Sequence, residues 1–157
     1  MARNASSKPV TPDQRIRELR KDFRSFDSEE PGPARAARLA TFTRAAHSER
    51  QLNMAMHTAG LCLEDDPDAP TLLVDAYAAD DDDAEARLAA LSDLADLGRY
   101  LGRDDVAEQA ATLLRDGARA WVAAASEGER RYRLRTVQSL TSREVADELR
   151  DELDRQG

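Results

Sequence analysis

The sequence is poor in the residues that build sheets, disulfides and cysteine-based metal centres. It has 157 residues and a single cysteine, Cys62, so it can form neither an intramolecular disulfide nor a zinc site of several cysteines. Valine occurs six times and isoleucine once, against 28 alanines and 18 leucines. Because β-branched residues favour strands whereas Ala and Leu favour helices, this composition predicts an all-α protein.

Long apolar runs are also missing. No stretch approaches the roughly 18 consecutive apolar residues of a membrane-spanning helix, and the opening residues, MARNASS, do not resemble a secretory leader. We therefore expect a cytoplasmic protein that makes no membrane contact. The length fits one domain, so we expect a disordered tail over residues 1–10 and a single all-helical domain over residues 11–157.

Capping residues predict where the first helix begins and ends. Thr11 can cap a helix, Pro12 suits its first position, and Gln14 completes a capping box. The helix should stop near Asp27, because Pro31-Gly32-Pro33 is a break that helices rarely cross.

The following segment, residues 34–64, has helical spacing throughout, and its length leaves open whether it is one helix or two. His47-Ser48-Glu49-Arg50 interrupts the apolar rhythm, so we favour two helices, with Ser48 as the cap of the second. A break at residues 65–70 precedes a short helix over 71–79 and a turn at 80–83.

The clearest pattern lies in residues 84–125, where two apolar stripes joined by a short linker predict an antiparallel αα-hairpin. Gly102 fits the position after a helix end, and Asp104 fits the cap of the next helix. Gly98 and Gly117 lie on the stripes themselves, where each costs about 1 kcal/mol relative to alanine. We therefore expect the two helices to approach closely at these glycines.

The C-terminal region is less clear. Tyr132, Leu134 and Thr136 alternate with arginines, so residues 130–140 form either a helix or an irregular connector. Thr141 to Glu144 has the pattern of a capping box that opens a last helix. Altogether, the sequence predicts a compact bundle or stacked αα-hairpins of six to seven helices.

Some of the spacing resembles the paired helices of tetratricopeptide repeats. Ala55, Ala59 and Pro67 match the second helix and terminal proline of that motif. The two best frames, anchored on Ala55 and Ala110, lie 55 residues apart, whereas the repeat unit is about 34 residues long. The resemblance therefore implies paired helices without a regular repeat.

Candidate residues for chemistry are few. His47, His57 and Cys62 are neighbours in the sequence, but on a helix their spacing directs them to different sides. The acidic runs at residues 64–66 and 80–83 lack the glycine and the alternating ligands of a calcium loop, so we interpret them as helix caps or solvating charge. The scattered glycines form no phosphate-binding loop. We predict a protein that is not an enzyme and has no cofactor and no metal site.

Charge is distributed unevenly along the chain, whose formal net charge is −8. Residues 1–62 hold 11 basic and 7 acidic side chains, residues 63–118 hold 4 and 16, and residues 119–157 hold eight of each. Two basic clusters are candidate interaction surfaces. The first consists of Arg17, Arg20, Lys21 and Arg24, and the second of Arg130, Arg131, Arg133 and Arg135 around Tyr132.

The segregated charge predicts a non-enzymatic protein-interaction or assembly subunit that binds another protein or a second copy of itself. The alternative is a small nucleic-acid-associated subunit of a larger complex, since arginine binds phosphates and stacks on bases. That alternative requires the two basic clusters to share one surface. Against it, the isoelectric point of about 4.8 is far from the basic value typical of nucleic-acid-binding domains.

Overall fold

The computed structural model describes residues 9–79 and 83–156. Within these residues the chain forms eight α-helices and one short 3-10 turn, and it contains no strand. The elements are α1 (Pro12–Ser25), η1 (Phe26–Ser28), α2 (Pro33–Ser48), α3 (Leu52–Asp65), α4 (Ala69–Ala78), α5 (Ala84–Tyr100), α6 (Asp104–Ala123), α7 (Glu127–Leu140) and α8 (Arg143–Gln156). The predicted all-α class is confirmed.

The predicted count of six to seven helices is too low. Residues 34–64 form the two helices favoured from the sequence, because Arg50 adopts a left-handed conformation with φ of 58° and ends the first of them. The backbone N–H of Gln51 then donates to the carbonyl of Ala46 at 2.8 Å, which closes the last turn of α2. Ser48 lies inside that turn, so it does not cap α3 as expected. Residues 130–140 are helical as part of α7.

Two other predicted caps are displaced by one residue. Asp104 is the first residue of α6, and Arg103 takes the cap position. At α8, Ser142 accepts a hydrogen bond from the N–H of Val145 at 3.2 Å. The hydroxyl of Thr141 instead donates to a carbonyl of α7 at 2.6 Å, because the tight turn makes Thr141 the last residue to close that helix. The start of α1 is as predicted, with both hydrogen bonds of its capping box present.

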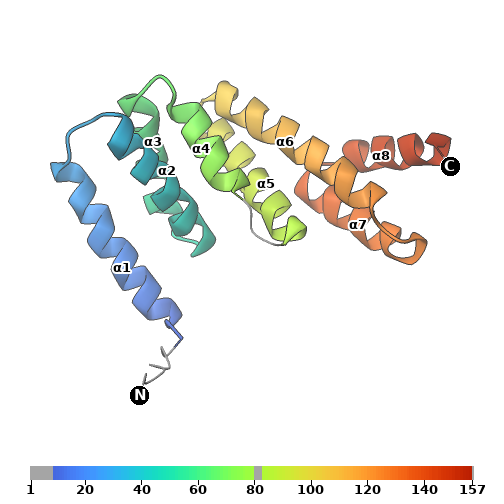
Figure 1. Ribbon diagram of the computed structural model, residues 1–157, viewed down its shortest axis with the longest axis horizontal. Helices are drawn as coiled ribbons and strands as arrows, with labels where there is room; N and C mark the ends of the chain where they lie inside the picture. The colour runs from blue at the N-terminus through green and yellow to red at the C-terminus, as the bar shows by residue number, and fades with distance from the viewer. Residues whose placement is uncertain (1–8, 80–82, 157) are drawn as a thin grey trace, which may run out of the picture.

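The helices follow one another along the long axis of the molecule (Figure 1). The α2/α3 pair lies near one end, α4 and the α5/α6 pair occupy the middle, and the α7/α8 pair lies at the other end. A large apolar cluster fills the first two parts and includes the fully buried Tyr77. A smaller cluster joins Val122 of α6 to Val137 and Leu149 of α7 and α8. Trp121 contacts both clusters, so α6 connects them.

The close approach predicted within residues 84–125 is present between α5 and α6. A methyl group at Gly98 would lie 2.8 Å from the backbone nitrogen of Ala107, and one at Gly117 would lie 2.9 Å from a terminal methyl of Leu88. Gly102 ends α5 with φ of 69°. These glycines therefore allow the helix contact, as the sequence predicts.

Two buried polar pairs join α2 to α3. The hydroxyls of Thr43 and Thr58 lie 2.9 Å apart, and each is 2.7 Å from a carbonyl one turn earlier in its own helix. Because a hydroxyl has one proton, one of the two donates to the other hydroxyl and the second donates to the carbonyl of its own helix. Arg35 donates to Asp65 at 3.1 Å, with 9% and 3% of their side chains exposed. Removing one member of this buried ion pair would leave the charge of the other buried without compensation, so the pair favours the observed register of the hairpin.

Substituting the two glycines separately tests the packing of α5 on α6. Gly98→Ala should lower the free energy of unfolding by about 1–3 kcal/mol, because the added methyl meets backbone that cannot move aside. Gly117→Ala should change it by less than about 1 kcal/mol, because Leu88 can rotate and alanine favours the helix. Chemical denaturation of both variants measures the difference. Equal effects would contradict the described contact.

Candidate interaction surfaces

Helix α1 lies against the body through one side only. Leu19 and Phe26 are buried, and Phe23 packs against Phe42 and His57 with ring centroids 6.4 and 5.3 Å away. Apolar contact on one side thus determines which side of α1 faces solvent.

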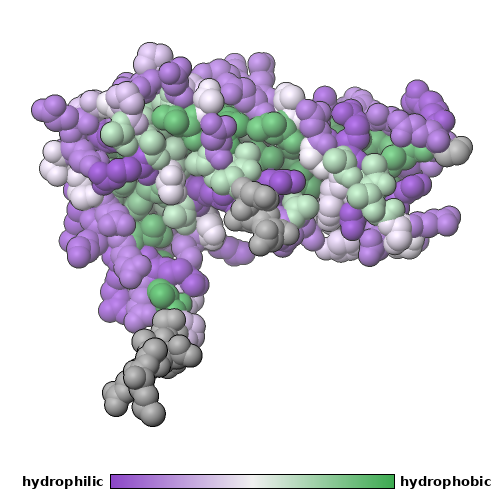
Figure 2. Space-filling model, in the orientation of Figure 1, coloured by the Kyte–Doolittle hydropathy of each residue, from purple (hydrophilic) through white to green (hydrophobic). Residues whose placement is uncertain are grey.

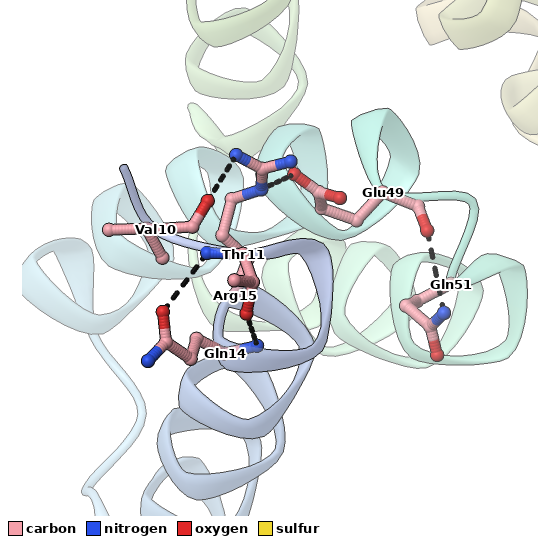
Figure 3. A network of polar contacts seen from close by, with 6 residues as sticks. All are labelled: Val10, Thr11, Gln14, Arg15, Glu49 and Gln51. Carbon is pink, nitrogen blue, oxygen red and sulfur yellow. Dashed lines mark hydrogen bonds and ion pairs between the residues drawn. The ribbon is translucent and has the colours of Figure 1, made fainter. Parts of the chain in front are cut away.

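A polar network holds the beginning of the same helix (Figure 3). Arg15 donates through Nε to Glu49, in the turn between α2 and α3, at 2.7 Å. It also donates to the carbonyl of Val10 at 3.3 Å. The N-terminal end of α1 projects beyond the neighbouring helices, with a mainly hydrophilic surface (Figure 2).

The first predicted cluster forms a continuous basic ridge on α1. Arg17, Arg20, Lys21 and Arg24 are all exposed and, with Ser25, line a shallow recess of about 530 Å³. Arg17 donates to a backbone carbonyl of its own helix, and none of the four forms an ion pair within the described parts of the chain. We call these four residues the α1 ridge.

Within the α1 ridge the four cations repel one another. Its members stand three or four residues apart on one helix, and like charges at that spacing destabilise a helix by about 0.2–0.5 kcal/mol per pair. Anionic groups on a partner would relieve this repulsion. The geometry therefore provides a surface whose binding energy comes mainly from charge.

The second predicted cluster is divided by the structure. Arg130, Arg131 and Arg135 line a groove of about 390 Å³ between α7 and α8, together with Arg150 of α8. Arg150 is ion-paired with Asp147 at 2.7 Å, whereas no ion pair of the other three occurs among the described residues. Sequence spacing could not identify Arg150, because only the packing of α8 on α7 brings it into the groove.

Arg133 and Tyr132 do not face that groove. Arg133 donates to the carbonyl of Trp121 at 2.6 Å, pairs with Glu129 at 3.1 Å, and stands 5.1 Å over the indole ring. Tyr132 donates its hydroxyl to Glu85 at 2.9 Å. Both side chains therefore connect α7 to neighbouring helices.

The two basic clusters lie at opposite ends of the molecule. Helix α1 is at one end of the long axis and α7 is at the other, with α4 to α6 between them (Figure 1). Those intervening helices belong to the acidic middle of the chain, residues 63–118. The clusters thus do not merge into one basic patch.

The histidines and the cysteine do not converge on one site. His47 bonds through Nδ1 to the hydroxyl of Tyr77 at 2.9 Å, whereas His57 is exposed beside Phe23. Cys62 is fully buried and donates to the carbonyl of Ala36. Burial, followed by the nearby acidic residues, raises the pKa of its thiol to about 12.

The acidic runs are accounted for by local contacts where the structure describes them. Asp83 caps α5 by accepting from the backbone N–H groups of Glu85 and Ala86 at 3.0 and 3.4 Å. Asp65 pairs with Arg35, and residues 80–82 lie outside the described residues. Across the described ranges, no group of three His, Cys, Asp or Glu side chains is arranged to hold a metal ion.

Comparison with known proteins adds no family or relative. No family model, no curated protein and no solved structure matches this chain. None of the described helices is both long and apolar enough to cross a membrane.

The burial of Cys62 predicts that its thiol is unreactive in the folded protein. Thiolate is the reactive form, and a pKa of about 12 leaves almost none of it at pH 8. A thiol-specific chromogenic reagent should therefore label the chain only after denaturant is added. Rapid labelling of the native chain would show that α2 and α3 open to solvent.

Proposed function

We propose that this chain is a non-enzymatic assembly subunit that uses the α1 ridge to bind an acidic protein surface. The observation that carries the proposal is the set of four cations, exposed on one side of a projecting helix, that make no ion pair with any described residue. Charge of this kind accelerates association and selects partners of opposite sign.

The chain itself offers a suitable acidic surface. Several carboxylates of the acidic middle are exposed on α4 and α6, including Asp75, Asp104 and Glu108. The α1 ridge of one copy therefore has a chemically matched surface on a second copy. Such a contact joins two different surfaces, so it builds a closed ring or an open chain of subunits.

Nucleic acid is the second candidate, restricted to the α7/α8 groove because the two basic clusters do not share the single surface that this alternative requires; the groove lining also holds Glu127, Asp147 and Asp154. Arg130, Arg131 and Arg135 present guanidinium groups that can bind phosphate. Against this candidate, the only aromatic residue between them, Tyr132, is bonded to Glu85. A long polyanion reaching both basic clusters would also cross the acidic middle, which would repel it.

Binding to a labelled polyglutamate peptide tests the leading proposal. Fluorescence anisotropy should show binding at low salt that weakens as salt is added, because the contact is between exposed charges. Reversing Arg17, Arg20 and Arg24 to Glu together should weaken it at least about tenfold. Reversing Arg130, Arg131 and Arg135 changes the net charge equally and should have a smaller effect.

The same titration with labelled DNA and RNA distinguishes the two candidates. The leading proposal expects nucleic acid to bind more weakly than polyglutamate at equal salt. Tighter nucleic-acid binding that depends on Arg130, Arg131 and Arg135 would favour the second candidate instead. Sedimentation velocity of the chain alone then shows whether a second copy supplies the acidic surface.

A further inference from the structure

A second groove, mostly apolar and without lysine or arginine in its lining, lies between the α2/α3 hairpin and α5. Its volume is about 320 Å³. The residues that line it are His47, Leu52, Ala55, Met56, Asp93, Asp96, Leu97 and Tyr100. Most of this lining is apolar, and its only acidic groups are the two aspartates of α5. We call it the α3/α5 groove.

Two apolar side chains that line this groove are unusually exposed to solvent. Leu52 and Tyr100 are 56% and 74% exposed, respectively. They are two of only five large apolar side chains that are exposed among the described residues. Tyrosine is enriched among the residues that dominate protein interfaces, because its ring offers apolar area and its hydroxyl a hydrogen bond.

Two aspartates of α5 and the imidazole of His47 are the polar side chains in the charged part of the groove lining. Asp96 is paired with Arg99, whereas Asp93 has no ion pair with a described residue. Partial burial raises the pKa of Asp93, and Asp96 adds to the rise, while His47 opposes it. A cation placed beside Asp93 would stabilise its ionised form.

We infer that the α3/α5 groove binds the apolar face of a helix from a partner protein, with a lysine or arginine of that helix beside Asp93. An amphipathic helix places apolar and basic side chains on adjacent faces, which matches an apolar floor bordered by a carboxylate. The exposed ring of Tyr100, two turns farther along α5, offers apolar area to the same partner helix. The volume of the groove lies at the lower end of the range of small-molecule pockets, about 300–1,000 Å³.

This inference is independent of the α1 ridge. The ridge is basic and lies on α1, whereas the groove is formed by α2, α3 and α5 and attracts cations. Reversing Arg17, Arg20 and Arg24 should therefore leave binding in the groove unchanged within about twofold. The two proposals can thus fail separately.

The probe for the test is a fluorescein-labelled synthetic helix with leucines on one face and lysines beside them. A second peptide, with glutamate in place of every lysine, is the control for charge. We expect the lysine peptide to bind the full chain and the glutamate peptide to bind at least about tenfold more weakly.

Two pairs of variants locate the site. Tyr100→Ala and Asp93→Lys should each weaken lysine-peptide binding at least about tenfold. Their controls, Leu113→Ala and Asp75→Lys, remove an exposed apolar side chain and reverse an exposed charge outside the groove. These controls should change binding by less than about twofold. Circular dichroism checks that every variant is folded.

Amide chemical shifts of the unmodified chain provide a readout that needs no variant. Addition of the lysine peptide should shift the signals of His47, Leu52, Met56 and Tyr100. No binding, shifts confined to other helices, or equal binding by Tyr100→Ala would each overturn the inference. Self-association of the chain that disappears in Tyr100→Ala would also overturn it, because the occupant would then be a second copy.

Discussion

Helix α6 is the element on which the rest of the structure depends. Its first half is buried with α4 and α5 through Val106 and Leu114, and its last turns are buried with α7 and α8 through Val122. Among the described residues, Trp121 of α6 contacts both apolar clusters, and Leu140 of α7 packs against the first. The tight contact at Gly98 positions α6 against α5, and α7 packs on α6 and also meets α5, where Ser92 donates to the carbonyl of Leu140.

The same architecture keeps the charged surfaces apart. Because the helices follow one another along a long axis, α1 and α7 cannot contribute to one basic patch (Figure 1). The interaction surfaces that result are separate and different: a basic ridge on α1, an arginine groove between α7 and α8, and an apolar groove beside Asp93.

The sequence predicted the elements well because helix periodicity and glycine placement are local signals. The α5/α6 hairpin, the capping box of α1 and the close approach at Gly98 and Gly117 all follow from spacing. The errors concern caps such as Ser48 and Thr141, where neighbouring residues compete for the same backbone groups. Spacing along the sequence did not predict the contacts between side chains of different helices. Arg133 turns toward Trp121 and Arg150 enters the α7/α8 groove through packing that spacing along one helix cannot encode.

We propose that the α1 ridge is the surface on which this protein assembles. Arginine Nε–H signals in nitrogen-15 NMR spectra report directly on guanidinium contacts, so a titration of the labelled full chain with polyglutamate at low salt tests it most directly. We predict that the signals of Arg17, Arg20 and Arg24 shift together and that high salt reverses the shift. Unchanged α1 signals accompanied by shifts of Arg130, Arg131 and Arg135 would contradict the account.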